Sequence, residues 1–71
     1  MKKLESWKIR ELIEEGKMPA DFIYEVRGVR GCSEIYKKAK TKFSGVKSCI
    51  TWAIRKGATY VIVEIIGVKE E

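Results

Sequence analysis

Apolar side chains recur with helical spacing in two segments, residues 3–15 and 45–56. In the first, the apolar positions are Leu4, Trp7, Ile9, Leu12 and Ile13. In the second, they are Val46, Cys49, Ile50, Ala53 and Ile54. Gly16 and Gly57 follow these segments as stop signals, and Ser44 stands at the N-cap position of the second. We predict an amphipathic helix over each segment.

Two other segments have the pattern of strands. Residues 21–29 alternate Phe22, Tyr24 and Val26 with a more polar set of side chains, and the Gly28–Gly31 stretch then predicts a turn. Residues 59–66 are β-branched and apolar on both faces, which predicts a central or covered strand that ends at Gly67.

The segment 34–43 fits two structures. As a strand it places one set of side chains on one face, namely Tyr36, Lys38, Lys40 and Lys42. The opposite face then has Ile35, Lys37, Ala39, Thr41 and Phe43. As a helix it groups Ile35, Tyr36, Ala39 and Phe43, but Lys42 intrudes into that arc. We favour a strand that pairs with residues 22–29 as a hairpin. A helix is the alternative, because Lys and Ala have low β propensity.

The predicted order is α-β-β-α-β, a small two-layer α+β fold in which a three-stranded sheet packs with one or two helices. Residues 1–71 form a single domain on this interpretation. The last two strands and the helix between them form a β-α-β unit with parallel strands, and the first strand fits between those two. The apolar arc of the first helix is wider than a small sheet covers, so we expect a homodimer through this helix. The alternative is that Trp7 and Leu12 cap the core.

The composition predicts the cellular location of the protein and the type of organism it comes from. No apolar run approaches the roughly 18 residues of a membrane span, and the first residues lack a signal-peptide pattern, so we expect a soluble cytoplasmic protein. His, Asn and Gln are absent while Lys and Glu are abundant, a composition typical of a thermophile.

The residue types argue against an enzyme and against a cofactor. Without His, the only pair of strand carboxylates available for acid–base chemistry is Glu25 and Glu64, and nothing in the sequence orients them. Cys32 and Cys49 alone cannot complete a zinc site, so we expect no metal and two free thiols.

Positive charge is concentrated in residues 27–56, which hold nine Lys and Arg residues against Glu34 alone, while the whole chain has a net charge of +5. Such a block attracts polyanions, and lysines two residues apart on a strand stand about 7 Å apart, a spacing that matches phosphates. We therefore predict sequence-tolerant binding of DNA or RNA by a small accessory or regulatory protein. The candidate residues are Arg27, Arg30, Tyr36, Lys38, Lys40 and Lys42. Two alternatives remain: lysines that merely protect an exposed strand, and an adaptor domain that binds an acidic protein partner.

Overall fold

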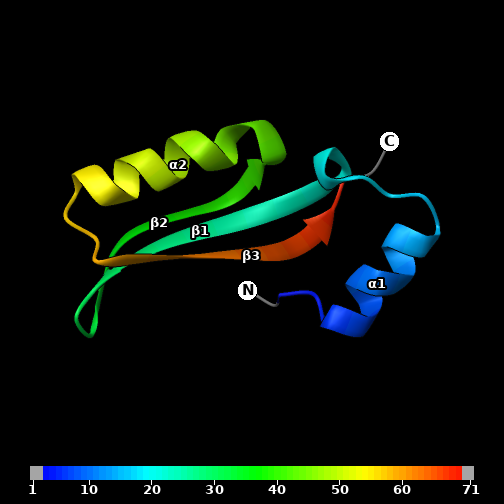
Figure 1. The fold of residues 1–71 in the computed structure, drawn as a ribbon, viewed down its shortest axis with the longest axis horizontal. Helices are drawn as coiled ribbons and strands as arrows, with labels where there is room; N and C mark the ends of the chain where they lie inside the picture. The colour runs from blue at the N-terminus through cyan, green and yellow to red at the C-terminus, as the bar shows by residue number, and fades with distance from the viewer. Residues whose placement is uncertain (1–2, 70–71) are drawn as a thin grey trace.

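The computed structural model describes residues 3–69 and has the predicted order of elements (Figure 1). Residues 3–69 form two helices, three strands and one 3₁₀ turn. They are α1 (Ser6–Glu14), the turn η1 (Pro19–Asp21), β1 (Phe22–Arg30), β2 (Ser33–Lys42), α2 (Phe43–Arg55) and β3 (Tyr60–Val68). The expected α+β class is confirmed, and so is the strand assignment of residues 34–42, whereas Phe43 belongs to α2.

The sheet has the order β2-β1-β3, with β1 antiparallel to both neighbours. The strands β2 and β3 therefore run parallel to each other with β1 between them, as the β-α-β pattern predicts. Helix α2 lies along one face of the sheet, mainly over β1 and β2, while α1 lies beyond one end of the sheet (Figure 1). The molecule is elongated, with extents of 38 × 21 × 16 Å.

Cross-strand pairing shows which side chains of β1 share a face. Every second residue of β1 faces α2, namely Tyr24, Val26 and Gly28. A Cβ atom added to Gly28 would lie 2.8 Å from the Cβ atom of Ala53 in this helix. We call this side of the sheet the covered face. The other side, which α2 does not cover, is the open face; from β1 it presents Ile23, Glu25, Arg27 and Val29.

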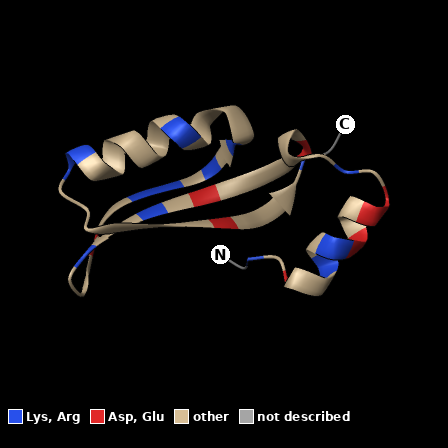
Figure 2. Cartoon of the chain, in the orientation of Figure 1, with Lys and Arg blue, Asp and Glu red and all other residues tan. Residues whose placement is uncertain are grey.

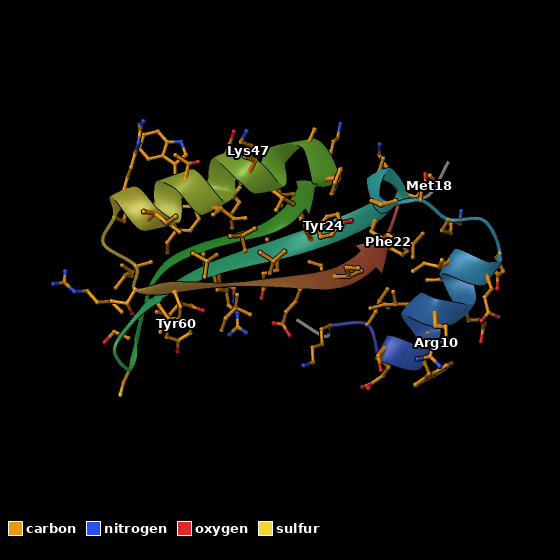
Figure 3. All side chains as sticks on the ribbon, viewed as in Figure 1. Arg10, Met18, Phe22, Tyr24, Lys47 and Tyr60 are labelled. Atoms are coloured by element: carbon orange, nitrogen blue, oxygen red, sulfur yellow. The ribbon has the colours of Figure 1, made fainter. Side chains whose placement is uncertain are left out.

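The core is small and has two connected parts. Under α2, Val26 and Ala53 have no exposed surface. At the end of the sheet, Leu12 of α1 packs with Phe22 and Tyr24. Figure 3 labels these two side chains of β1. Partly buried apolar side chains surround this second part, namely Leu4, Ile9, Val46, Ile65 and Val68.

Helix α1 uses only part of its apolar arc within the chain. Leu12 is buried, whereas Trp7 and Ile13 are 65% and 56% exposed. Just before the helix, the backbone N–H of Leu4 donates a 2.9 Å hydrogen bond to the carbonyl of Ile65 at the outer edge of β3. Of the two roles considered for Trp7 and Leu12, the structure gives the core-capping role to Leu12 alone.

The regular alternation predicted for β2 is broken twice. Tyr24 pairs with Thr41 and Val26 with Lys38, so one residue of β1 faces two of β2 at Ala39 and Lys40. Lys40 has φ of 58°, a left-handed conformation that non-glycine residues rarely adopt. A second extra residue, Ile35, lies nearer the hairpin. Each bulge shifts the side-chain alternation by one residue.

Several predicted boundaries need correction. Gly28 and Arg30 belong to β1, and the hairpin turn is Gly31 and Cys32, with Gly31 at φ of 62° where a tight hairpin needs a glycine. Helix α2 begins at Phe43, so Ser44 lies inside its first turn and is not the N-cap. Gly67 lies within β3 and does not end it. The stops at Gly16 and Gly57 are confirmed, at φ of 101° and 100°.

The bulge at Lys40 yields a prediction about stability. We expect Lys40→Gly to raise the free energy of unfolding by roughly 1 kcal/mol, because glycine adopts a positive φ without the steric cost that Lys40 bears. Lys38→Gly, in the regular part of the same strand, should instead destabilise the fold. Urea denaturation of both variants measures this, and a Lys40→Gly variant no more stable than the wild type contradicts it.

Candidate nucleic-acid interface

The six residues predicted to bind nucleic acid do not share one face. Arg27 pairs with Lys37, whereas Tyr36 pairs with Gly28 and Lys38 with Val26. Tyr36 and Lys38 therefore stand on the covered side, and Arg27 on the open side. The expectation that Arg27 joins the lysines beside Tyr36 is wrong, because the strand register sets Lys37 opposite it.

The bulge separates the lysines of β2 as well. Lys42 pairs with Ile23 and stands on the open side, opposite to Lys38. Lys40 lies in the bulge between them. Arg30 extends toward the C-terminal end of α2, where one of its Nη atoms would lie 3.3 Å from a Cβ atom added to Gly57. The predicted single row of ammonium groups is thus a set of exposed cations around the free edge of β2.

Arg27 is held by three carboxylates on the open face. Its guanidinium donates a 2.8 Å hydrogen bond to Glu64 and lies 3.4 Å from Glu25 and 3.8 Å from Glu34. The neighbouring cation Lys37 lies 3.9 Å from Glu25. These two cations of the charge block are therefore compensated inside the protein.

The carboxylates need this compensation. Glu25 and Glu64 are directly opposite each other on neighbouring strands, where like charges repel. Glu25 is only 7% exposed, so its carboxylate has lost most of its hydration. The guanidinium of Arg27 lies between both carboxylates and removes the repulsion.

The charge network lowers the pKa of Glu64. Burial acts to raise this pKa, but the ammonium of Lys3, 3.3 Å from the carboxylate, and the guanidinium of Arg27 outweigh it. The net effect is a pKa below the ordinary value of 4.5. The cluster on the open face thus works as an ion-pair network, in which the predicted acid–base pair of Glu25 and Glu64 is tied to cations.

Tyr36 is half-buried on the covered face beside Cys49 of α2. Burial raises the pKa of Tyr36, and the hydrogen bond and charge of the Cys49 thiol act in the same direction. A ring in this position packs against the protein, and its place on the covered face gives it a structural role that the strand pattern did not reveal.

Six exposed cations on β2, on α2 and at the C-cap of α2 have no ion-pair partner among residues 3–69. They are Lys38, Lys40, Lys42, Lys47, Arg55 and Lys56, which we call the basic surface. No acidic residue occurs in the sequence between Glu34 and Glu64, and α2 in Figure 2 has Lys and Arg but no acidic residue. Lys47 points away from the sheet on the outer side of α2 (Figure 3). The choice of six candidate residues omitted the α2 cations, although the acid-free run of sequence marks them.

An aromatic side chain accompanies these cations. Trp52 on α2 is 52% exposed, and the guanidinium of Arg55 lies 5.5 Å from the centre of its ring. An exposed ring beside cations is the combination that stacks on unpaired bases while phosphates are neutralised.

Within residues 3–69, no group of three or more His, Cys, Asp or Glu side chains is placed to hold a metal ion. None of the helices in that range is long and apolar enough to cross a membrane.

The ion-pair network predicts a pH dependence of stability. Because the pKa of Glu64 is lower in the folded than in the unfolded chain, its carboxylate stabilises the fold above about pH 4.5, and this contribution disappears as the pH falls through the folded pKa. Glu64→Gln should therefore flatten the stability profile between pH 6 and pH 3, and Lys3→Ala should flatten it partly. Urea denaturation across this range tests it, and a Glu64→Gln profile parallel to that of the wild type is inconsistent with the network.

The two thiols should differ in reactivity. Both cysteines are unpaired, with Cys32 exposed in the hairpin turn and Cys49 buried in α2. We expect a thiol reagent to modify Cys32 quickly in the native protein and Cys49 only on unfolding. Cys32→Ser should remove the fast phase and Cys49→Ser should leave it. Mass spectrometry that finds a Cys32–Cys49 bond under non-oxidising conditions contradicts this expectation.

Comparison with known proteins adds no relative to this picture. No protein-family model, no curated protein and no solved structure matches the chain. A functional assignment therefore rests on the arrangement of the residues described above.

Proposed function

We propose that this protein binds nucleic acid with little sequence preference, through phosphate contacts from the basic surface, as a small accessory or regulatory protein. The observation that carries the proposal is the acid-free run between Glu34 and Glu64, whose cations on β2 and α2, apart from Lys37, have no ion-pair partner among residues 3–69. Each cation that neutralises a phosphate releases a counterion, and this release drives association.

The basic surface supports the proposal better than the open face does. On the open face, Arg27 and Lys37 already contact carboxylates, so a phosphate there would compete with Glu25 and Glu64 and be repelled by them. Along the free edge of β2, Lys38 and Lys42 project from opposite sides of one strand. A phosphate backbone that follows this edge would meet cations from both sides.

The residue types limit what such a surface can read. Specific recognition of base edges relies on Arg, Asn and Gln, and the chain has no Asn or Gln. Trp52 provides a stacking surface for unpaired bases, which every base can use. We therefore expect similar affinities for different sequences and a preference for single strands over duplexes.

An acidic protein partner is the alternative occupant of the same surface, since carboxylates also pair with unpartnered lysines. The homodimer through α1 expected from the sequence is one possible mode of assembly, and the exposure of Trp7 and Ile13 on that helix is consistent with it. A cytoplasmic location suits either partner. These possibilities are separated by the binding and assembly measurements described below.

Binding should depend steeply on salt. If all six cations contact phosphates, the slope of log affinity against log salt should be roughly −4 to −5, so affinity should fall roughly 250- to 1,000-fold between 50 and 200 mM salt. The triple variant K38E/K42E/K47E should weaken binding to every probe and roughly halve the slope. Fluorescence anisotropy with single-stranded DNA, duplex DNA and RNA measures both effects.

The matched control carries the same change in charge elsewhere. Arg10, Lys17 and Lys69 lie outside the basic surface and have no ion-pair partner in residues 3–69, so R10E/K17E/K69E should keep most of the affinity. Equal losses in the two triple variants would mean that net charge alone attracts the nucleic acid. Absence of binding at about 50 mM salt and micromolar protein would reject the proposal in favour of the acidic-partner alternative.

A further inference from the structure

The outer edge of β3 has an open section of backbone. The carbonyl of Ile65 points away from β1, because it accepts from Leu4. Backbone groups alternate in direction along a strand, so those of Val63 and Val61 point outward too. Within residues 3–69, no backbone group bonds to either valine from that side.

The two edge strands of the sheet, β2 and β3, differ in charge and in regularity. The β2 edge has four lysines and two bulges, devices that prevent a further strand from pairing. Between Tyr60 and Val63, β3 has no charge, no proline, no glycine and no bulge. Tyr60 is 52% and Val63 is 42% exposed, so apolar surface on both faces accompanies the open backbone. Such an edge aggregates unless a specific strand occupies it.

We propose that a second copy of this chain occupies it, with the two β3 strands antiparallel and Ile62 at the two-fold axis. In this register Val61 faces the partner's Val63, and Val63 faces the partner's Val61. Each of these two pairs forms two backbone hydrogen bonds, so all four outward groups of each chain are used. The dimer then contains one continuous sheet of order β2-β1-β3-β3-β1-β2.

The length of the open section fits this register. At one end β3 begins after the bend at Thr59, whose N–H is already bonded to Val29, and at the other end Leu4 occupies Ile65. In the register centred on Ile62, residue 60 of one chain faces residue 64 of the other. Each strand therefore leaves the sheet where the Leu4 segment of its partner begins.

The side chains are complementary to themselves in this register. The valines meet on the covered side, and Ile62 meets the partner's Ile62 on the open side, both favourable cross-strand pairs. Tyr60 faces the partner's Glu64, whose charge is compensated by Lys3 and Arg27 within its own chain. No like charges face each other. A foreign strand could pair with the backbone, but nothing in the structure selects its side chains.

This geometry separates dimerisation from the proposed binding surface. The two-fold axis runs perpendicular to the sheet, so both α2 helices lie on the same face and both β2 edges lie on the outside. The outer strands stand about 24 Å apart, five strand spacings, with the basic surfaces at opposite edges. Dimerisation does not require the proposed function to be correct.

A charge-swap experiment tests the interface and its register. V61K/V63K places lysines opposite lysines across the axis, and V61E/V63E does the same with glutamates, so each variant alone should be monomeric. An equimolar mixture should restore the dimer, because each lysine then faces a glutamate. Analytical ultracentrifugation of the wild type, the variants and the mixture provides the masses, and circular dichroism confirms the fold of each variant.

The matched control places the same charges on the exposed side of α2. S44K/S48K and S44E/S48E should dimerise like the wild type, because Ser44 and Ser48 are exposed and distant from the β3 edge. W7E, on α1, should also stay dimeric. Loss of the dimer in W7E but not in V61K/V63K would assign the interface to α1 and overturn the proposal.

Amide exchange in the wild type gives an independent readout. The N–H groups of Val61 and Val63 should become protected from exchange as the protein concentration rises, while that of Ile62, which points to β1, is protected throughout. A wild-type chain that stays monomeric at millimolar concentration overturns the proposal. Protection of Val61 and Val63 at every concentration in a monomer would also overturn it, because the chain itself would then cover the edge.

Discussion

The fold depends on the close approach of α2 to the centre of the sheet at Gly28. A Cβ atom at this position would lie 2.8 Å from Ala53, 3.1 Å from Ala58 and 3.3 Å from the Cβ atom of Tyr36, so only glycine lets helix, loop and strand meet there. With one small residue on each element, α2 lies close enough to bury Val26 completely. Contacts that position the helix over β1 and β2 also decide which surfaces stay free.

One helix on one face leaves the opposite face of the sheet without a layer. Long charged side chains cover it instead: Glu25 is buried to 7% exposure beneath Arg27 and Lys37, although no helix lies above it. A buried carboxylate of this kind is stable only while its cations stay in place. The open face therefore uses part of the positive block for internal structure. Among residues 3–69, the members of this block that remain for a partner are Arg30 and the cations at the β2 edge and on α2.

The sequence predicts the order of the elements because most of them have a clear period, whereas the boundaries expected at Gly28, Ser44 and Gly67 are wrong. The β2 segment shows the limit of this reasoning. Binary alternation assigns Lys38, Lys40 and Lys42 to one face, but an extra residue at the bulge costs little in an edge strand and is invisible to a period of two. The partners of Arg27 were equally hidden, since Glu64 is 37 residues away and meets it only once β3 pairs with β1. Site residues that depend on register could not be assigned from spacing.

The two edge strands differ in how they can support a chain of 71 residues, whose core is small. So small a domain buries only about 60% of its unfolded surface, and association is one way to stabilise it. Association through the β2 edge is unfavourable, because pairing two such edges would bring lysines without ion-pair partners together. The β3 edge has no charged side chain between Tyr60 and Val63, where its backbone is open. Pairing two copies edge to edge there would extend the apolar layer without bringing like charges together. In the two proposals, self-association and polyanion binding therefore use opposite edges of one sheet, and neither would limit the other.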